Sequence, residues 1–243
     1  RFLNAANARI LNFELSGGVM MKVICLDGSP CESFDTNRIT LGPAQRVDVL
    51  IEDASHLVEL LEVSSSKALN AAIFEPISSK LTSVKNSLST EPYYSWPDTK
   101  NAKKIDVHMQ GGAMGNLSKA TFEGEERGLR DLALKEAKLW AFNGNIGGYG
   151  LSLAEIEIGE VVVIKAWNDT AWPHAMHLHG HHFWVDSSEF GDKKRALLRD
   201  TYLMQPGEKA ELVFIANNPG AWLFHCHMLE HHAAGMGGVI YIS

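Results

Sequence analysis

Short apolar runs bounded by Gly, Asn, Asp or Pro recur along most of the chain. In QRVDVLIED, for example, Val47, Val49 and Ile51 alternate with polar or edge positions, which is the period of a half-buried β-strand. Comparable strand-like runs are RFLNAANARILNFEL, MMKVICLDG, RITLGP, KIDVHMQ, EIEIGEVVVIKAWND, HHFWVDS, KAELVFIANNPG and GVIYIS. Many short strands separated by turn residues predict an all-β fold, a sandwich or a barrel.

One segment departs from the strand pattern. In EERGLRDLALKEAKLW, four apolar residues recur near helical spacing, namely Leu129, Leu132, Ala133 and Leu139. The sequence therefore predicts one short helix in an otherwise β-rich chain.

A change of composition divides the chain into two parts. The segment after Ser78 is rich in Ser, Lys and Asn and contains Pro92 and Pro97, which is typical of a connector. We therefore expect a linker over residues 79–103. Residues 104–243 would form a domain of ordinary size, whereas residues 1–78 are too few for a complete sandwich of about 100 residues. The pattern predicts the C-terminal part of one β-domain, followed by a whole second one.

Composition and charge exclude several functional classes. The chain is 45% hydrophobic and 21% charged, as an ordinary globular protein is. No apolar run approaches the roughly 20 residues of a membrane-spanning helix, so we expect no membrane span. The formal charge of −7 comes from 29 acidic and 22 basic residues and gives no basic cluster for a nucleic-acid partner. The sequence opens on Arg1 without a recognisable secretory signal.

The cysteines fall into two kinds of surroundings. Cys25 and Cys31 flank the turn sequence LDGSP and could pair in an oxidising compartment, although two unpaired thiols are the favoured interpretation. Cys226 differs, because it lies inside a cluster of histidines.

Nine of the eleven histidines lie between His174 and His232, in the segments WPHAMHLHGHH and FHCHMLEHHAAGM. His56 and His108 lie outside these clusters, and we interpret them as structural. Successive side chains of a strand point to opposite faces. In the strand-like segment GAWLFHCHM, His225 and His227 should therefore share one face and Cys226 should occupy the other. His177 and His179 should share a face in the same way, so one short segment can serve two sites.

The surroundings of Cys226 point to a metal. His231 and Met236 follow it by five and ten residues, a spacing that suits a loop folding back over the cysteine. A thiolate, two imidazoles and a weak thioether are the ligands of a blue-copper site, and His174, Cys226, His231 and Met236 supply that set. Zinc also accepts Cys and His, but the paired cysteines of structural zinc sites are missing. A catalytic Cys–His dyad would leave most of the histidines without a role. Copper is the favoured metal.

These motifs resemble a known family. HAMHLHGHHF and HCHMLEHHAAGM resemble the two C-terminal copper signatures of the multicopper oxidases, which include laccases and copper-efflux oxidases. The segments RFLNAANARILNFEL, LDGSPCE, LGPAQRVDVLIE, WAFNG, LRDTYLMQPGE and NNPGAWLFHCHM extend the resemblance to essentially the whole chain. It runs from the middle of domain two to the end of domain three of bacterial three-domain members. The resemblance implies cupredoxin-like Greek-key β-sandwich domains, one partial and one complete, and a periplasmic or secreted location.

The resemblance also implies a copper cofactor of three types and assigns residues to each. The type 1 copper would be bound by His174, Cys226 and His231, with Met236 as the axial ligand. His177 would bind the type 2 copper, and the type 3 pair would be bound by His179, His225 and His227. Electrons would enter at His231 and Cys226 and reach the trinuclear cluster through His225 and His227. Three further histidines match no ligand position, namely His181, His182 and His232.

The implied reaction is one-electron oxidation of a reductant coupled to reduction of dioxygen to water. The reductant would be a phenolic or aromatic molecule or a low-valent metal ion. Met109 and Met114 are interpreted as packing or loop residues and not as a metal-handling motif. The family completes its trinuclear cluster with H-x-H pairs from an N-terminal cupredoxin domain, and no such pair precedes His174. We therefore expect that domain to be needed and this chain alone to be inactive.

Two alternatives from other functional classes are a copper-binding electron-transfer protein and a cupredoxin scaffold without copper. The histidines on both sides of Cys226 disfavour the first, and the full ligand set disfavours the second.

Overall fold

The computed structural model describes residues 1–51, 56–76, 89–187 and 197–243. It divides into two compact units, Arg1–Tyr94 and Ser95–Ser243. The division lies within the expected linker, residues 79–103, of which 79–88 lie outside the described residues. The Tyr93 hydroxyl donates a hydrogen bond of 2.7 Å to the backbone oxygen of Gly28 in the first unit. Trp96 instead packs on Trp184 of the second unit, with 6.1 Å between ring centroids.

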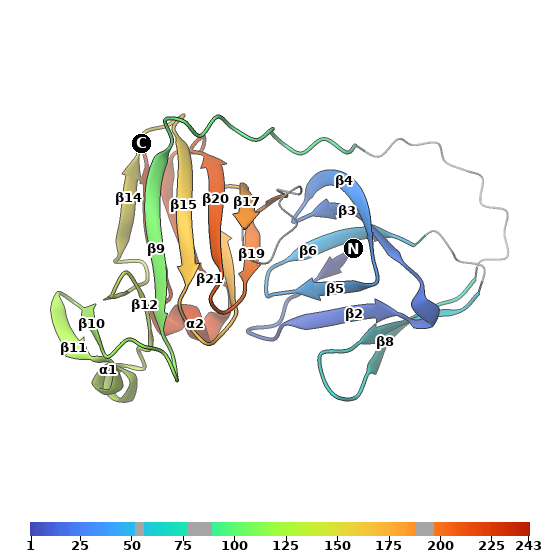
Figure 1. The fold of residues 1–243 in the computed structure, drawn as a ribbon, viewed down its shortest axis with the longest axis horizontal. Helices are drawn as coiled ribbons and strands as arrows, with labels where there is room; N and C mark the ends of the chain where they lie inside the picture. Colours follow the sequence, from blue (N-terminus) through green and yellow to red (C-terminus); the bar gives the residue numbers. More distant parts are fainter. Residues whose placement is uncertain (52–55, 77–88, 188–196) are drawn as a thin grey trace. The chain divides into compact units, whose positions relative to one another are not determined.

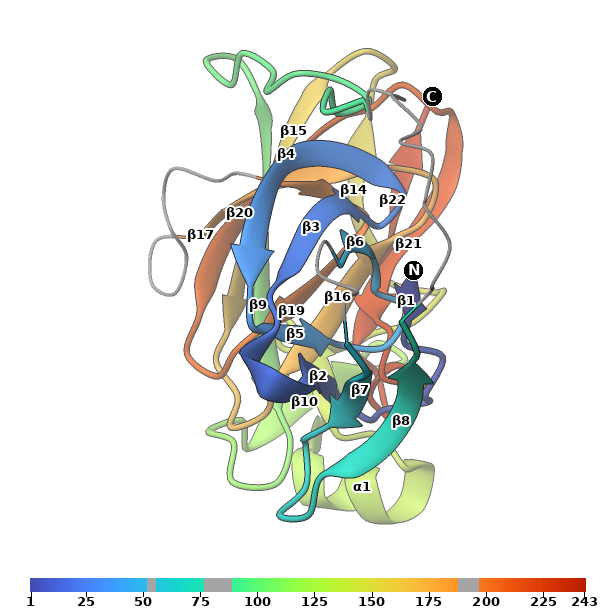
Figure 2. The same cartoon turned by 90° about the vertical axis from the view of Figure 1, so that its right-hand side faces the viewer.

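The first unit contains two four-stranded sheets. One has the order β1 (Phe2–Leu3), β6 (Arg46–Leu50), β3 (Met21–Leu26) and β4 (Ser29–Thr36). The other has the order β5 (Arg38–Leu41), β2 (Leu11–Leu15), β7 (Val58–Glu62) and β8 (Leu69–Phe74), and the β7–β8 pair is clearest in Figure 2. A short 3-10 turn, η1 (Ser16–Gly18), follows β2. Phe2 and Phe13 contact each other across the two sheets, with ring centroids 5.4 Å apart.

The second unit pairs a nine-stranded sheet with a five-stranded one. The larger has the order β11 (Glu125–Gly128), β10 (Lys119–Phe122), β13 (Asn145–Ile146), β12 (Trp140–Phe142), β9 (Lys103–Gly111), β15 (Val161–Asn168), β20 (Lys209–Ile215), β17 (Phe183–Ser187) and β18 (Leu198–Arg199). The smaller has the order β14 (Ser152–Ile156), β22 (Gly237–Ile242), β21 (Gly220–Cys226), β16 (His174–Leu178) and β19 (Thr201–Met204). Figure 1 shows β9, β15 and β20 side by side, with β21 behind them. Phe142 and Phe224, both fully buried, meet between the two sheets.

The predicted all-β fold class is therefore confirmed, but two predicted runs are each split between sheets. RFLNAANARILNFEL forms β1 and β2 in different sheets, because the buried Asn4 side chain donates hydrogen bonds to the backbone oxygens of Arg9 and Leu41 and holds the intervening chain in a loop. EIEIGEVVVIKAWND likewise forms β14 and β15, and the turn between them contains Gly159 at a φ of +90°.

Three hairpins of the structure have two-residue turns whose residues both have positive φ. The turns are Asp27–Gly28, Glu123–Gly124 and Asn143–Gly144. Such turns match the right-handed twist of the paired strands, and Asn-Gly and Asp-Gly are the residues that form them most readily. These dipeptides fix the register of the hairpins that they close.

The predicted short helix is confirmed as α1 (Leu129–Glu136). Ala137, in a left-handed conformation with a φ of 54°, ends it, so Leu139 lies beyond the helix. Leu132 is fully buried and packs in a cluster with Leu129, Ala120, Ala141 and Ile146. A second helix, α2 (Leu229–Ala233), lies where we expected only a loop after Cys226. No helix among the described residues is long and apolar enough to span a membrane.

Two further cysteines and two methionines considered above lie outside the histidine clusters. Cys25 and Cys31 are not joined in a disulfide. Met109 is fully buried in the core on β9, whereas Met114 is 80% exposed in a loop. Both positions agree with the interpretation as packing and loop residues.

We predict that Leu132→Ala lowers the free energy of unfolding by about 2–5 kcal/mol, because it removes a fully buried side chain and leaves a cavity between α1 and the sheet. Urea unfolding measures the loss. Leu134→Ala is the matched control, since Leu134 lies on the same helix and is 78% exposed, so it should change stability by less than about 0.5 kcal/mol. Equal effects of both substitutions would contradict the placement of the helix.

Candidate metal centre

Strands β16 and β21 bring the two histidine clusters together. They pair antiparallel, with Met176 opposite Cys226 and His177 opposite His225. The residues that follow β21 therefore lie beside the start of β16. There His227 N–H donates a hydrogen bond of 2.7 Å to the Ala175 backbone oxygen. Along β21 the side chains alternate as a strand requires. Cys226 points to one group of ligand atoms, and His225 and His227 contribute to another.

The first group consists of His174, Cys226 and His231, whose ligand atoms all lie within 4.8 Å of one another. His174 Nδ1 and His231 Nδ1 are 3.0 Å apart, and Cys226 Sγ is 3.6 Å from His231 Nδ1. Among the described residues, this is the one set of three His, Cys, Asp or Glu side chains that could hold a metal ion together. His174 and Cys226 are fully buried, and His231 is half-buried on α2.

The segment from Cys226 to Met236 closes into a compact loop over this group. Cys226 N–H donates to the Met236 backbone oxygen (3.1 Å), and Met236 N–H donates to the His231 backbone oxygen (3.0 Å). Met236 is fully buried, so the loop places a thioether-bearing residue beside the thiol and the imidazole. Gly235 allows the close turn, because a Cβ there would lie 2.4 Å from the Trp140 backbone oxygen and its φ is +114°.

Burial sets the charge of the donors. It lowers the pKa of His174 well below its ordinary value, with a further contribution from His231, and it lowers the pKa of His231 as well. Burial also raises the pKa of the Cys226 thiol to about 12. The imidazoles are therefore neutral at neutral pH and have lone pairs to offer. The thiolate needs a cation in contact with it, because a coordinated metal ion deprotonates a thiol outright.

A hydrogen-bond chain fixes the tautomer of His174. The Thr170 hydroxyl donates to Asn168 Oδ1 (2.7 Å) and lies 2.9 Å from His174 Nε2. Because the hydroxyl has one proton and gives it to Asn168, it accepts from His174 Nε2–H. His174 Nδ1 then carries the lone pair, and this is the atom that faces His231 and the group around Cys226. Asn168 is itself anchored by donating to the backbone oxygens of Trp172 and Gln205.

The second group consists of four imidazoles, those of His177, His179, His225 and His227. Ring centroids are 4.9 Å apart for His177–His179, 5.6 Å for His177–His227 and 5.5 Å for His225–His227. His179 Nε2 and His225 Nε2 lie 3.0 Å apart. His179 is exposed, and His225 is buried, which lowers its pKa to about 3. One side of this group is thus open to solvent in the chain.

Backbone oxygens set the tautomers of two of these rings. His177 Nδ1 lies 2.8 Å from the Asp200 backbone oxygen, and His225 Nδ1 lies 2.9 Å from the Cys226 backbone oxygen. A carbonyl oxygen only accepts, so each Nδ1 carries the proton and each Nε2 carries a lone pair. For His225 that lone pair faces His179 Nε2. His227 Nδ1 is buried without a hydrogen-bond partner. Four imidazoles thus converge at the ends of β16 and β21, and those of His177 and His225 have their lone pairs on Nε2.

The other histidines have surroundings of a different kind. His181 is buried against Phe214 and Trp222, and its Nδ1 lies 3.3 Å from the His179 backbone oxygen. His232 packs against His225, with ring centroids 4.7 Å apart. Although His232 matches no ligand position of the motif, its ring contacts a member of the imidazole group. His182 is half-buried, and His56 is exposed on the first unit.

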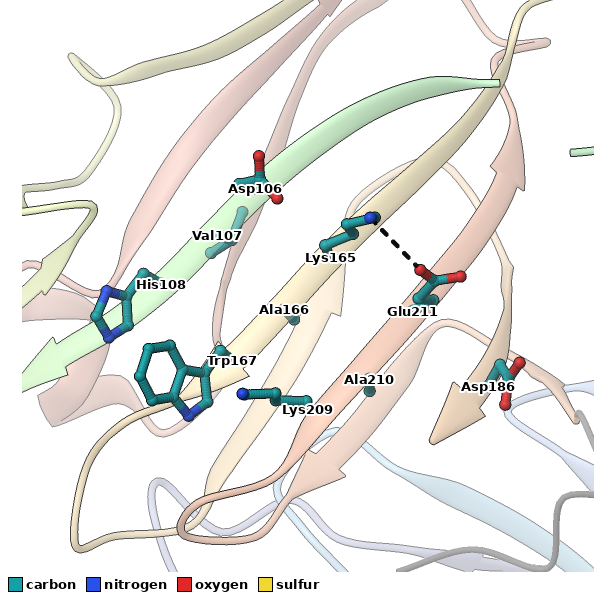
Figure 3. A pocket seen from close by; sticks show the side chains of 10 residues that line it. All are labelled: Asp106, Val107, His108, Lys165, Ala166, Trp167, Asp186, Lys209, Ala210 and Glu211. Carbon is teal, nitrogen blue, oxygen red and sulfur yellow. Dashed lines mark ion pairs between the residues drawn. The ribbon is translucent and has the colours of Figure 1, made fainter. Parts of the chain in front are cut away.

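His108 lies at a separate hollow on the outer face of the nine-stranded sheet (Figure 3). This pocket has a volume of about 460 Å³ and is lined by residues of β9, β15, β20 and β17. His108 stacks on Trp167 at 4.2 Å, Lys209 lies 4.7 Å above the same indole, and His108 Nε2 pairs with Asp169 at 2.9 Å. The partners of His108 are thus an indole and a carboxylate of this face, which agrees with a structural role.

Comparison with known proteins assigns the chain to a family. Models described as "Multicopper oxidase" match residues 125–243 and residues 1–56, and together they cover more than half of the chain. The chain belongs to the multicopper oxidase family.

Individual members are distant in sequence. The chain is 27% identical over 241 residues to multicopper oxidase MmcO of Mycobacterium tuberculosis, covering 97% of this chain and 44% of that protein. It is 27% identical to multicopper oxidase mco of Staphylococcus haemolyticus, covering all of this chain and 47% of that protein. A laccase-like multicopper oxidase, CueO from an Ochrobactrum species, superposes with a TM-score of 0.76 at 22% identity, over 99% of this chain and 54% of the other. The chain thus spans about half the length of the curated relatives that it matches.

Family membership implies a copper cofactor of types 1, 2 and 3, and the structure fits this metal. A buried thiol beside two neutral imidazoles and a buried methionine is the soft, mixed donor set that copper prefers. The structural likeness also confirms the cupredoxin-like class of the fold.

We predict that Thr170→Val lowers the free energy of unfolding of the copper-free chain by about 1–3 kcal/mol, because His174 Nε2–H and Asn168 Oδ1 both lose a buried partner. Urea unfolding measures this. Thr170→Ser keeps the hydroxyl and is the control. A valine variant as stable as the serine variant would mean that the hydrogen-bond chain does not support His174.

Proposed function

We propose that this chain is the copper-bearing C-terminal part of an oxidase that uses dioxygen as electron acceptor. Cys226 carries the argument, because its side chain joins one donor group while its two neighbours in sequence join the other. In this proposal residues 1–78 are the C-terminal part of a second cupredoxin domain, and residues 104–243 are the complete third domain.

The donor groups suggest which residues hold each copper. His174, Cys226, His231 and Met236 would hold the type 1 copper, His177 the type 2 copper, and His179, His225 and His227 the type 3 pair. Copper at these positions supplies one-electron redox chemistry and binding of dioxygen. The four converging imidazoles are half of what the family's trinuclear cluster uses. A missing N-terminal cupredoxin domain would supply the rest, and the exposed edge of His179 supports a partner on that side.

The chain itself connects the two donor groups. His231 is half-buried at the surface end of the type 1 group, and its imidazole edge suits electron entry. Cys226 is joined to His225 and to His227 by single peptide links, and His225 Nδ1–H also donates to the Cys226 carbonyl. An electron delivered to the Cys226 sulfur can therefore reach both imidazoles along covalent bonds and a short hydrogen bond, without a diffusing carrier.

The proposed reaction is the one-electron oxidation of four reductant molecules, with reduction of one dioxygen by four electrons and four protons to two water molecules. We infer a phenolic or aromatic compound or a low-valent metal ion as the reductant. The Ochrobactrum relative is described as active towards lignin model compounds, and the Campylobacter jejuni relative as a metallo-oxidase, which supports these two classes equally. We also infer a periplasmic or secreted location from the family resemblance.

The alternatives are an electron-transfer protein and a copper-free scaffold. An electron-transfer protein needs the Cys226 group but has no use for the group of four imidazoles to which His225 belongs. A copper-free scaffold has no use for a buried thiol and two imidazoles whose ligand atoms all lie within 4.8 Å of one another. Both observations favour the oxidase.

We predict that Cys226→Ser abolishes the intense visible absorption of the copper-loaded protein while far-UV circular dichroism stays unchanged, because only a thiolate gives that charge-transfer band. Cys31→Ser is the matched control, since Cys31 is also a buried cysteine outside any disulfide but lies in the first unit. The control should keep the band. A blue Cys226→Ser protein would contradict the type 1 assignment.

We further predict that the isolated 243-residue chain binds copper at the Cys226 group but consumes no dioxygen, whereas the protein extended by its N-terminal domain does. An oxygen electrode with a phenolic reductant, and separately with Cu(I), measures turnover and distinguishes the two reductant classes. Laccase-like oxygen uptake by the isolated monomeric chain would show that the trinuclear cluster needs no further domain.

A further inference from the structure

One indole lies against both imidazoles of the type 1 group. The Trp140 ring is 4.9 Å from that of His174, edge-on at 83°, and 4.7 Å from that of His231, tilted at 49°. The two histidines come from different elements, β16 and α2, and their rings meet at 63° with 4.8 Å between centroids. Trp140 is only 4% exposed, so its ring closes the space beside both.

The backbone of Trp140 is tied to the same loop that carries His231. The N–H groups of Leu139 and Trp140 both donate to the backbone oxygen of Ala234, at 2.9 and 3.0 Å. Ala234 directly follows α2, and its own N–H donates to the Glu230 oxygen. Strand β12 therefore holds the end of α2 by its backbone while the indole contacts the histidine of that helix.

The six-membered ring of the indole rests on glycine. A Cβ on Gly112 would lie 2.3 and 2.5 Å from two atoms of the six-membered ring, and Gly112 has a φ of +82°. Any larger residue would push the ring out of its position. Gly112 N–H donates to the Leu139 backbone oxygen at 2.9 Å, which holds this glycine against β12.

The two histidines differ in what else orients them. His174 has the Thr170 hydroxyl on its Nε2, as described above. His231 receives no hydrogen bond at Nε2 from any residue of the described ranges, and its ring nitrogen contacts are the Nδ1 distances to His174 and Cys226. An imidazole without a partner on its far nitrogen can turn about its Cβ–Cγ bond, so packing has to hold it.

We propose that Trp140 is a positioning residue of the type 1 site, whose indole holds the His174 and His231 rings at the angle from which both Nδ1 atoms face Cys226. This inference rests on the proposed function, because it concerns copper geometry. It makes the WAFNG segment part of the site, although Trp140 provides no ligand atom. Surrounding groups that orient ligands typically account for about 10- to 100-fold in metal affinity.

The test compares Trp140→Phe with Trp167→Phe in the copper-loaded protein. Trp167 also stacks on a histidine, His108, but on the outer face of the nine-stranded sheet, so it controls for loss of an indole–imidazole contact. We expect Trp140→Phe to weaken copper binding about tenfold. It should also shift the thiolate absorption band, the Cu(II) electron paramagnetic resonance spectrum and the reduction potential. Trp167→Phe should leave all four quantities unchanged.

Trp140→Tyr, which retains a larger aromatic ring, should restore part of each change and serves as the second variant if the phenylalanine protein does not fold. Circular dichroism of the copper-free proteins decides which variants are folded. A folded Trp140 variant with wild-type band, resonance spectrum and potential overturns the proposal, as does failure of both variants to fold, which would make Trp140 a core residue only. Absence of the band in the wild-type protein would instead refute the type 1 assignment itself.

Discussion

The register between β16 and β21 is the constraint on which the rest of the site depends. With His177 opposite His225 and Met176 opposite Cys226, the imidazoles of His177 and His225 fall on one face and the thiol falls on the other. Side chains of a strand alternate with a period of two, so a slip of one residue would turn Cys226 toward the imidazoles. The neighbours of β21 protect this register, since β22 pairs with it continuously from Gly220 to His225. Two chemically different donor groups can therefore lie on either side of one backbone.

Placing these donors inside a β-sandwich is costly, because buried polar groups without partners destabilise a fold. The chain offsets much of this cost with its own atoms. Thr170 and Asn168 satisfy the far nitrogen of His174, and carbonyl oxygens satisfy Nδ1 of His177 and His225. The Nε2 atoms of His179 and His225 are left facing each other, 3.0 Å apart. The protein thus orients its donors by internal hydrogen bonds and leaves the inward-facing atoms for a cation.

Some of these features could be predicted from the sequence, because they depend on residues close together in the chain. Strand alternation alone placed His225 and His227 opposite Cys226, and the spacing to Met236 indicated a chain that returns over the thiol. The short helix was visible because Leu129 and Leu132 have helical spacing. Features that depend on distant segments were not visible. Asn4 breaks an apparent strand through a bond to Leu41, and α2 forms within a loop whose closure depends on Cys226, His231 and Met236. Neither Trp140 nor Thr170 is marked by the sequence as part of the metal site, since their importance arises only when each contacts His174 in the folded chain.

The two donor groups differ in how complete they are, because different kinds of segment supply their residues. Three of the four type 1 candidates belong to one eleven-residue segment, from Cys226 to Met236, which closes on itself through backbone hydrogen bonds. The fourth, His174, is fixed by residues of its own unit, so this group needs nothing from outside. The imidazole group is built from two strand ends instead, and His179 stays exposed at its edge. A site of this kind has donors on one side only. The closed group can therefore form within this unit alone, whereas the proposed trinuclear cluster would need a further domain on the open side of the imidazole group.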